Sequence, residues 1–223
     1  MVRPPQIIPY GDSALLMQFM SDGYSRDVIR TVQAMSSELR ADPDWIEVVS
    51  GYDSLLLEFD PLKLDPVAAE GKLINLVNGF KPGQVPTGRL VEIPVYYGGK
   101  DGPDMQLIMD AAGLGESEVI SLHSAREYLV CMMGFIPGFA FLSAAHDRLY
   151  HPRHETPRGR VPAGSVGIGG WQTGIYGLES PGGWQIIGRT DITIFDATRD
   201  EPFYLSAGDR VKFVPATRGS AKG

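Results

Sequence analysis

Residues 156–176 read TPRGRVPAGSVGIGGWQTGIY. Glycine and proline interrupt short β-branched runs in this stretch, and no helical period runs through it. The wider window 134–190 holds 12 of the chain's 27 glycines. This texture predicts a compact, mainly-β barrel or sandwich. We expect its strands near Val166–Ile168, Trp184–Ile187, Ile192–Phe195 and Arg210–Val214.

Residues 1–80 have a different pattern, in which strand and helix signals alternate. Ser25 and Asp65 are expected to cap two amphipathic helices, the first reaching about Arg40 and the second beginning with Pro66. The order β-α-β-β-α predicts a small α+β unit with helices on one face of a mainly antiparallel sheet. The expected strands are Ala14–Phe19, Ile46–Val49 and Ser54–Phe59.

Helix- and strand-breaking residues fill Lys81–Gly88, which predicts a linker between two domains. We expect an N-terminal α+β domain over residues 1–82, a linker over 83–88 and a mainly-β domain over 89–223. In the second domain, Pro94 is expected to move the strand Val91–Tyr96 towards a sheet edge. Two short helices are expected over Met105–Ala112 and Ser117–Ser124.

Composition excludes several classes of protein. Hydrophobic residues make up 43% of the 223 residues and the net charge is −7, so the chain is expected to fold and to bind neither nucleic acid nor an anionic membrane. No segment approaches the ~20 apolar residues of a membrane span, and the N-terminus is not typical of a signal peptide. Cys131 is the sole cysteine and lies in an apolar run, which favours a buried thiol and a cytoplasmic protein.

Charge is distributed unevenly along this acidic chain. The window 134–190 carries five arginines against three acids, a local charge of +2 that leaves −9 for the rest. Arginine forks and glycine N–H groups suit a small anion, so we expect Arg158 and Arg189 to bind one. The alternative is that these arginines only solvate loops.

Polar and aromatic residues of the same window complete the predicted pocket. Hydroxyl and amide groups can orient a polar amide substrate; these are expected from Ser165, Gln172, Thr173 and Tyr176. Glycine, proline and aromatic residues are expected to shape the pocket, although they can equally be barrel turns or, for the tryptophan, core. These residues are Gly134, Phe135, Pro137, Gly138, Phe139, Pro162, Gly164, Gly182, Gly183 and Trp184.

Familiar catalytic motifs are missing from the chain. It has no P-loop, no complete dinucleotide fingerprint and no nucleophile elbow. His151 and His154 could suggest zinc, but Pro152 disfavours a helix and no further ligand supports them. We expect no metal in this chain, and the residues that move protons stay undefined.

Four motifs in one order resemble a known family. They are Gly134–Leu142, Thr156–Val166, Gln172–Tyr176 and Ser180–Thr190. The family is that of the 5-oxoprolinase B subunits, also called the kinase-inhibitor or allophanate hydrolase subunit 1 family. The resemblance implies an N-terminal ferredoxin-like domain and a C-terminal cyclophilin-like β-barrel domain.

The resemblance also implies a function. It indicates a heteromeric amidohydrolase in which this chain, a carboxyltransferase-like C subunit and an A subunit convert 5-oxoproline to L-glutamate with ATP. ATP use would belong to the assembled complex, and the chain alone is expected to be inactive. Two alternatives stay open: an inhibitory protein that binds a sensor histidine kinase, and a carboxyltransferase-type protein that acts on a urea-derived amide.

Overall fold

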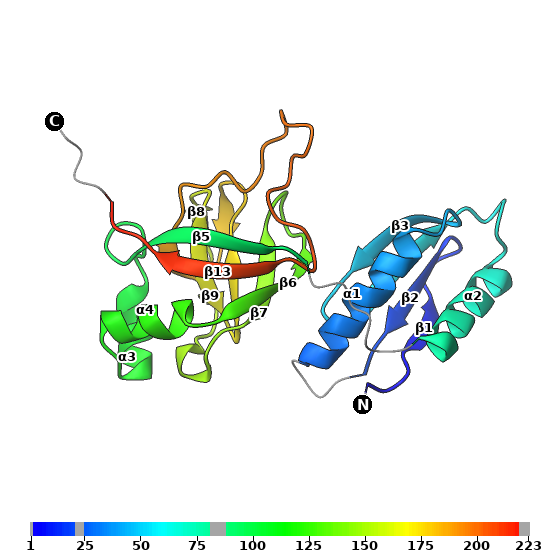
Figure 1. The fold of residues 1–223 in the computed structure, drawn as a ribbon, viewed down its shortest axis with the longest axis horizontal. Coiled ribbons are helices and arrows are strands. Elements are labelled where there is room, and N and C mark those ends of the chain that lie inside the picture. Colours follow the sequence, from blue (N-terminus) through cyan, green and yellow to red (C-terminus); the bar gives the residue numbers. More distant parts are fainter. Residues whose placement is uncertain (1, 21–24, 81–87, 219–223) are drawn as a thin grey trace. The chain divides into compact units, whose positions relative to one another are not determined.

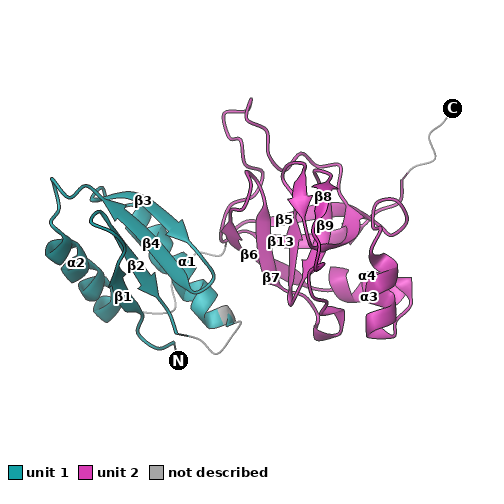
Figure 2. Cartoon of the chain, turned by 180° about the vertical axis from the view of Figure 1, so that it is seen from behind, with its two compact units in different colours: residues 1–87 teal, residues 88–223 magenta. Residues whose placement is uncertain are grey.

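The structure is a computed structural model that describes residues 2–20, 25–80 and 88–218 (Figure 1). The chain divides into two compact units, residues 1–87 and 88–223 (Figure 2). Except for Gly88, the predicted linker lies outside the described residues. Within the described residues, no helix is long and apolar enough to span a membrane.

The first unit holds a four-stranded sheet in which every pair is antiparallel. The strand order is β1-β2-β4-β3. The three predicted strands are confirmed within one residue at each end, whereas the N-terminal β1 was not predicted. The strands are β1 Gln6–Pro9, β2 Ala14–Gln18, β3 Trp45–Ser50 and β4 Ser54–Phe59.

Two helices cover one face of this sheet, and both begin as the sequence predicts. The helices are α1 Arg26–Arg40 and α2 Pro66–Gly79. The side chain of Ser25 accepts a hydrogen bond from Val28 N, and Asp65 accepts from Val67 N and Ala68 N. These caps satisfy N–H groups that the first helical turn leaves unpaired.

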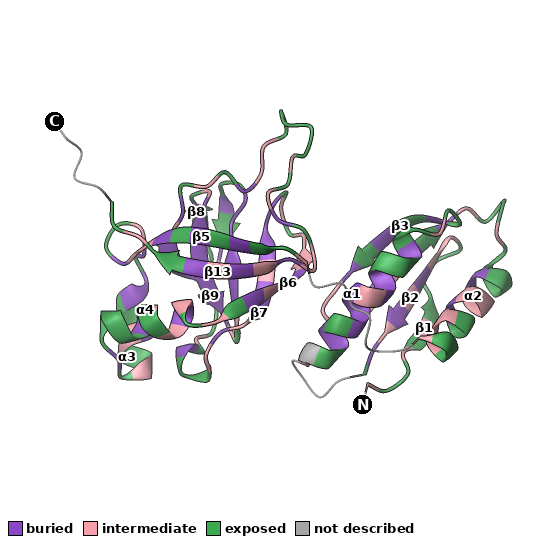
Figure 3. Cartoon of the chain, viewed as in Figure 1, coloured by how far each residue is buried: buried purple, intermediate pink, exposed green. Residues whose placement is uncertain are grey.

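Alternate strand residues and both helices share one core. Leu15, Met17, Leu55 and Leu57 are at most 2% exposed and belong to a single buried cluster with side chains of α1 and α2. Figure 3 shows this alternation of buried and exposed positions along the strands. Because strand side chains alternate between faces, the cluster places both helices on the same face.

The second unit is a closed seven-stranded barrel, as its glycine-rich texture predicts. Around the barrel the order is β10-β7-β6-β13-β5-β12-β9, and a separate ribbon pairs β11 with β8. Closure leaves the barrel without edge strands. The strands are β5 Leu90–Tyr97, β6 Glu127–Met133, β7 Ala140–Ala144, β8 Arg158–Val161, β9 Ser165–Gly169, β10 Gln172–Ile175, β11 Ser180–Gly182, β12 Gln185–Arg189 and β13 Arg210–Pro215.

Helices close part of the barrel surface. The two predicted helices are confirmed as α3 Met105–Ala112 and α4 Glu116–Ser124, and a short 3-10 turn follows at Asp147–Leu149. Met105 and Val119 are at most 3% exposed and belong to the barrel core. Cys131 is also buried.

The expected edge position of β5 is wrong. This strand pairs with β13 on one side, in parallel, and with β12 on the other. The N–H groups of Arg210 and Ala216 donate to the carbonyls of Arg89 and Val95, so Arg89 and Val95 direct their backbone groups towards β13. Backbone groups of successive strand residues point to opposite sides, so the nitrogen of Pro94 points away from β13, towards β12. On that side, β5 pairs with β12 only at Tyr96 and Tyr97. The sheet therefore loses no hydrogen bond because Pro94 lacks an N–H.

The expected strand over Ile192–Phe195 is also wrong, since Phe195 makes only an isolated bridge to Phe203. The hydroxyl of Thr190 accepts a hydrogen bond from Ile192 N at 3.2 Å. Such local side-chain bonds compete with a strand ladder. Ile194 nevertheless points into the core and is 1% exposed.

Candidate functional site

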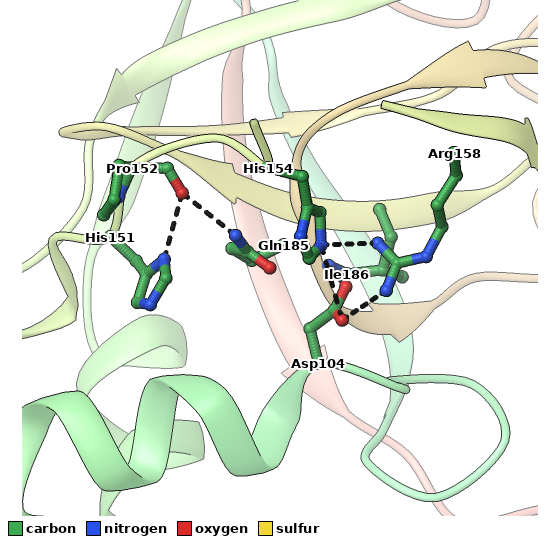
Figure 4. Close-up of polar contacts among 7 residues, drawn as sticks. All are labelled: Asp104, His151, Pro152, His154, Arg158, Gln185 and Ile186. Atoms are coloured by element: carbon green, nitrogen blue, oxygen red, sulfur yellow. Dashed lines mark hydrogen bonds and ion pairs between the residues drawn. The ribbon is translucent and has the colours of Figure 1, made fainter. Parts of the chain in front are cut away.

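A buried carboxylate organises the polar groups at the start of α3. Asp104 is 2% exposed, and its Oδ2 accepts a hydrogen bond from Ile186 N at 2.6 Å. Its Oδ1 accepts from the guanidinium of Arg158 (Figure 4). The backbone N–H of Asp104 also donates to the carbonyl of Ile186 at 2.9 Å. Asp104 therefore ties α3, β8 and β12 together.

The same arginine fixes the ring of His154. Arg158 Nη1 lies 2.7 Å from His154 Nε2. A guanidinium can only donate, so Nε2 accepts and the ring proton resides on Nδ1. The 3.6 Å between His154 Nε2 and Asp104 Oδ1 is too long for a hydrogen bond and would join two acceptors. We therefore assign His154 to Arg158 and not to Asp104.

Gln185 lies next to this network, in the buried part of β12. Its Nε2 donates to the carbonyl of Pro152 at 3.0 Å, and the same carbonyl accepts from His151 Nδ1 at 2.9 Å. Figure 4 shows the Gln185 carboxamide between the rings of His151 and His154. Segment 151–158 is thus joined to β12 at two places. Pro152 accepts a hydrogen bond from Gln185, and Arg158 is linked to Ile186 through Asp104.

The two arginines predicted to bind an anion lie in different surroundings. The charge of Arg158 is matched by Asp104, and its side chain is 34% exposed. Arg189 donates through Nε to the carbonyl of Ala163 at 3.0 Å. Within the described part of the chain, no contact joins Arg158 to Arg189. The structure does not bring them together as one anion clamp.

The predicted orienting residues are mostly inside the unit. Ser165 and Thr173 are 2% and 0% exposed, and Tyr176 is 1% exposed, whereas Gln172 is half-buried. Burial raises the pKa of Tyr176, while a backbone hydrogen bond from Trp184 opposes the shift. Contact of Ser165, Thr173 or Tyr176 with a ligand outside the barrel would require movement, so their substrate role stays a prediction.

Thr173 belongs to a directed hydrogen-bond chain through the barrel interior. Its hydroxyl donates to the carbonyl of Gly167 at 3.0 Å, so it accepts from His123 Nε2 at 2.8 Å. The other ring nitrogen of His123 then accepts from the hydroxyl of Tyr97 at 2.8 Å. His123 is 0% exposed, and burial lowers its pKa to about 3. Every polar atom of this neutral chain is satisfied, which indicates a structural role.

Thr173→Val tests this chain at nearly constant volume. It removes the acceptor of the His123 N–H and the donor to the Gly167 carbonyl, which lie in the buried interior. We expect a loss of about 2 kcal/mol in the free energy of unfolding of the barrel unit. Calorimetry measures it, and Thr173→Ser, which keeps the hydroxyl, should lose less than half as much. Equal losses in the two variants would refute the hydrogen-bond account.

The predicted pocket-shaping aromatics come together, but as a small core. Phe139, Tyr176 and Trp184 form one buried cluster with Val161 and Ile186. Phe139 contacts Tyr176 and Trp184 edge-on, with ring centroids 4.8 and 5.5 Å apart. This geometry favours aromatic packing over a platform for a ligand.

The predicted glycines and prolines lie in turns and loops around that core, except Gly182, which ends β11. Gly138 and Gly164 have φ of 75° and 79°, and a Cβ on Gly164 would lie 2.2 Å from the Thr190 carbonyl oxygen. A Cβ on Gly182 would lie 2.2 Å from the Tyr176 hydroxyl. Gly183 accepts a hydrogen bond from His154 N at 2.7 Å. Pro137 and Pro162 are exposed, and Gly134 is half-buried.

Phe135 has the one positive φ of a non-glycine residue in the described part of the chain, at 70°. Ile136 N donates to the carbonyl of Gly134 at 2.9 Å, which closes a tight three-residue turn around Phe135. Such a turn is rare and strained. Its ring is 65% exposed, so this loop presents an aromatic side chain to solvent.

Sequence reasoning missed Asp104 and Gln185 and considered His151 and His154 only as zinc ligands. The described residues contain no group of three or more His, Cys, Asp or Glu that could hold a metal ion. One usable signal was Gln185, a polar residue inside the apolar run Trp184–Ile187. The pairing of Asp104 with Arg158 spans 54 residues and leaves no local pattern.

Comparison with known proteins identifies the family of this chain. Residues 5–205 match the family described as carboxyltransferase domain, subdomain C and D. The 5-oxoprolinase B subunit of Haemophilus influenzae is 39% identical over 93% of this chain and 96% of its own length. The Bacillus subtilis protein of that name is 36% identical over 94% and 92%. The chain belongs to the family of 5-oxoprolinase B subunits.

Other matches cover less of the matched protein's length. The Escherichia coli 5-oxoprolinase B subunit is 52% identical, but the match spans 60% of this chain and 62% of that protein. The solved structure of TTHA0988 is 37% identical with a TM-score of 0.80, and the match covers 98% of this chain and 41% of that one. The chain thus spans less than half of the TTHA0988 chain. The Kluyveromyces lactis urea amidolyase shares the fold at 20% identity and a TM-score of 0.75.

Proposed function

We propose that this chain is the B subunit of an ATP-dependent 5-oxoprolinase that converts 5-oxoproline to L-glutamate. The observation that carries the proposal is the match to relatives of that name over more than 90% of their length at 36 and 39% identity. The polar network of Asp104, Arg158 and His154, with Gln185 beside it, is the proposed substrate-binding region.

The proposal extends to partners and cofactor. Members of this family are expected to act with a carboxyltransferase-like C subunit and an A subunit, and ATP is used by the assembled complex. This chain covers 15% of the urea amidolyase chain whose fold it shares, which supports assembly with further domains or subunits. We infer that the chain alone is inactive and that it acts in the cytoplasm.

We also propose that the first unit has a ferredoxin-like fold and that the second has a cyclophilin-like barrel fold. In the first, β2, α1, β3, β4 and α2 follow the ferredoxin-like order. The N-terminal β1 lies beside β2, where that fold would place a strand after α2. The proposal of a cyclophilin-like fold is supported by the closed barrel with its accompanying helices α3 and α4.

Reconstitution tests the proposed activity. The chain and its proposed A and C partners are purified separately, and ATP hydrolysis is measured with and without 5-oxoproline. We expect stimulation of at least about tenfold only when all three proteins are present. Stimulation by a urea-derived amide instead, or recovery of a histidine kinase and no carboxyltransferase-like partner from the cell, would replace this function with one of the two alternatives.

A further inference from the structure

Gln185 on β12 and the nearby His151 and His154 each have one polar side-chain atom in a hydrogen bond and a second without a partner among the described residues. Gln185 is 2% exposed, and its Oε1 has no hydrogen-bond partner in the described structure. Its orientation is fixed because Nε2 donates to the Pro152 carbonyl, which accepts only an N–H. An unpaired acceptor in a buried site lowers the stability of the folded protein, so we expect this oxygen to accept a hydrogen bond from a bound molecule.

His154 offers the complementary group. Its Nε2 accepts from Arg158, which leaves Nδ1–H as a donor, and Nδ1 has no hydrogen-bond partner among the described residues. A backbone hydrogen bond holds His154 close to the start of β12, because His154 N donates to the carbonyl of Gly183, two residues before Gln185. The buried Asp104 holds Arg158 in place, so the tautomer of His154 is fixed by a charged partner.

His151 is the third of these side chains, and it lies on the other side of Gln185 from His154 (Figure 4). It donates through Nδ1 to the same Pro152 carbonyl as Gln185, so its Nε2 is the acceptor nitrogen. His151 and His154 are half-buried, whereas Gln185 is buried. Binding of a ligand to Gln185 Oε1 therefore requires segment 151–154 to move between its two anchors, the backbone bonds to Gly170 and Gly183.

The acceptor Gln185 Oε1 and the donor His154 Nδ1–H together complement one edge of a cyclic amide, which carries an N–H next to a carbonyl. We propose that Gln185 Oε1 accepts the ring N–H of a lactam while His154 Nδ1–H donates to its carbonyl oxygen. Arg158 and Asp104 act as positioning residues for His154. This inference rests on the proposed function and names the part of the substrate that this chain recognises.

Binding of N-methylated analogues provides the test. Dissociation constants of 5-oxoproline and N-methyl-5-oxoproline are measured for the full chain in complex with its co-purified partner proteins. Because a site that hydrogen-bonds an N–H rejects an analogue without one, we expect the methylated compound to bind at least about tenfold more weakly. In Gln185→Leu this ratio should fall towards one, mainly through weaker binding of 5-oxoproline.

Two further variants keep the test decisive. Gln185→Met retains an unbranched side chain of similar length if the leucine variant does not fold. Gln106→Leu changes an exposed glutamine on α3 whose side chain, within the described residues, bonds only to Asp110, and it should leave both constants unchanged. Folded Gln185 variants that keep the wild-type ratio would overturn the proposal and indicate that Gln185 Oε1 binds only a buried water.

The experiments distinguish an incorrect binding site from an incorrect function. If the complex does not hydrolyse ATP with 5-oxoproline, the function fails, and the amide site is then tested with 2-pyrrolidinone and N-methyl-2-pyrrolidinone, which lack the carboxylate. A Gln185-dependent preference for the N–H compound supports the site on its own. Binding of none of the four compounds to the wild-type complex would overturn it.

Discussion

Asp104→Ala is expected to lower the free energy of unfolding of the barrel unit by about 3 kcal/mol. The carboxylate accepts hydrogen bonds from Ile186 N and Arg158, so its loss leaves a buried N–H and a positive charge without their partner. Because Arg158 is one-third exposed, we place the loss at the lower end of the range for broken buried pairs. The two units need not unfold together, so urea denaturation is followed by hydrogen exchange of peptides from α3 and β12.

Two companion variants separate charge from geometry in this experiment. Asp104→Asn can keep one acceptor oxygen and should lose less than the alanine variant. Glu179→Gln disrupts the exposed ion pair with Arg160, whose side chains are 48% and 77% exposed, and should cost less than about 1 kcal/mol. If Asp104→Ala costs no more than Glu179→Gln, Asp104 does not organise this region.

Acidification from pH 6.5 to 4.5 is expected to lower the free energy of unfolding of the barrel unit by about 2 kcal/mol through His123 alone. Burial lowers the folded-state pKa of this ring from its ordinary value near 6.5 to about 3. Between these values the unfolded chain binds a proton that the folded chain does not, so stability is lost as pH falls. Urea denaturation across this range measures the slope.

The pH window is chosen to isolate histidine. Arg218 lowers the pKa of Asp101, and Thr198 lowers that of Asp196, so the stability that these carboxylates contribute is lost mainly below their ordinary pKa of 3.8. His123→Gln removes the titrating ring, and although it destabilises the unit, its unfolding free energy should change less with pH. An unchanged slope in this variant would show that other groups titrate.

Local signals predicted the first unit well. Ser25 and Asp65-Pro66 begin helices through bonds to residues two or three positions away, so the sequence contains the whole signal. The barrel was predicted as a class but not in its pairing. β13 pairs with β5 across about 120 residues, and no pattern near Pro94 or Arg210 reveals that parallel ladder.

The sequence likewise predicted some residues of the candidate site but not their partners or orientations. Arg158 was singled out from its charge and glycine-rich setting, but its partner Asp104 lies in another element, so a predicted anion ligand proved to be paired within the chain. Thr173 was expected to face a substrate, yet alternation along β10 turns it towards His123. Which side of a barrel strand faces inwards depends on closure, which sequence alone did not determine.

Hydrogen exchange of the assembled complex with and without 5-oxoproline tests most directly whether the polar network beside β12 binds substrate. We predict that the largest protection on this chain falls within residues 150–158 and 183–187. Protection confined to other parts of the barrel, with none in these two segments, would contradict the assignment of the site.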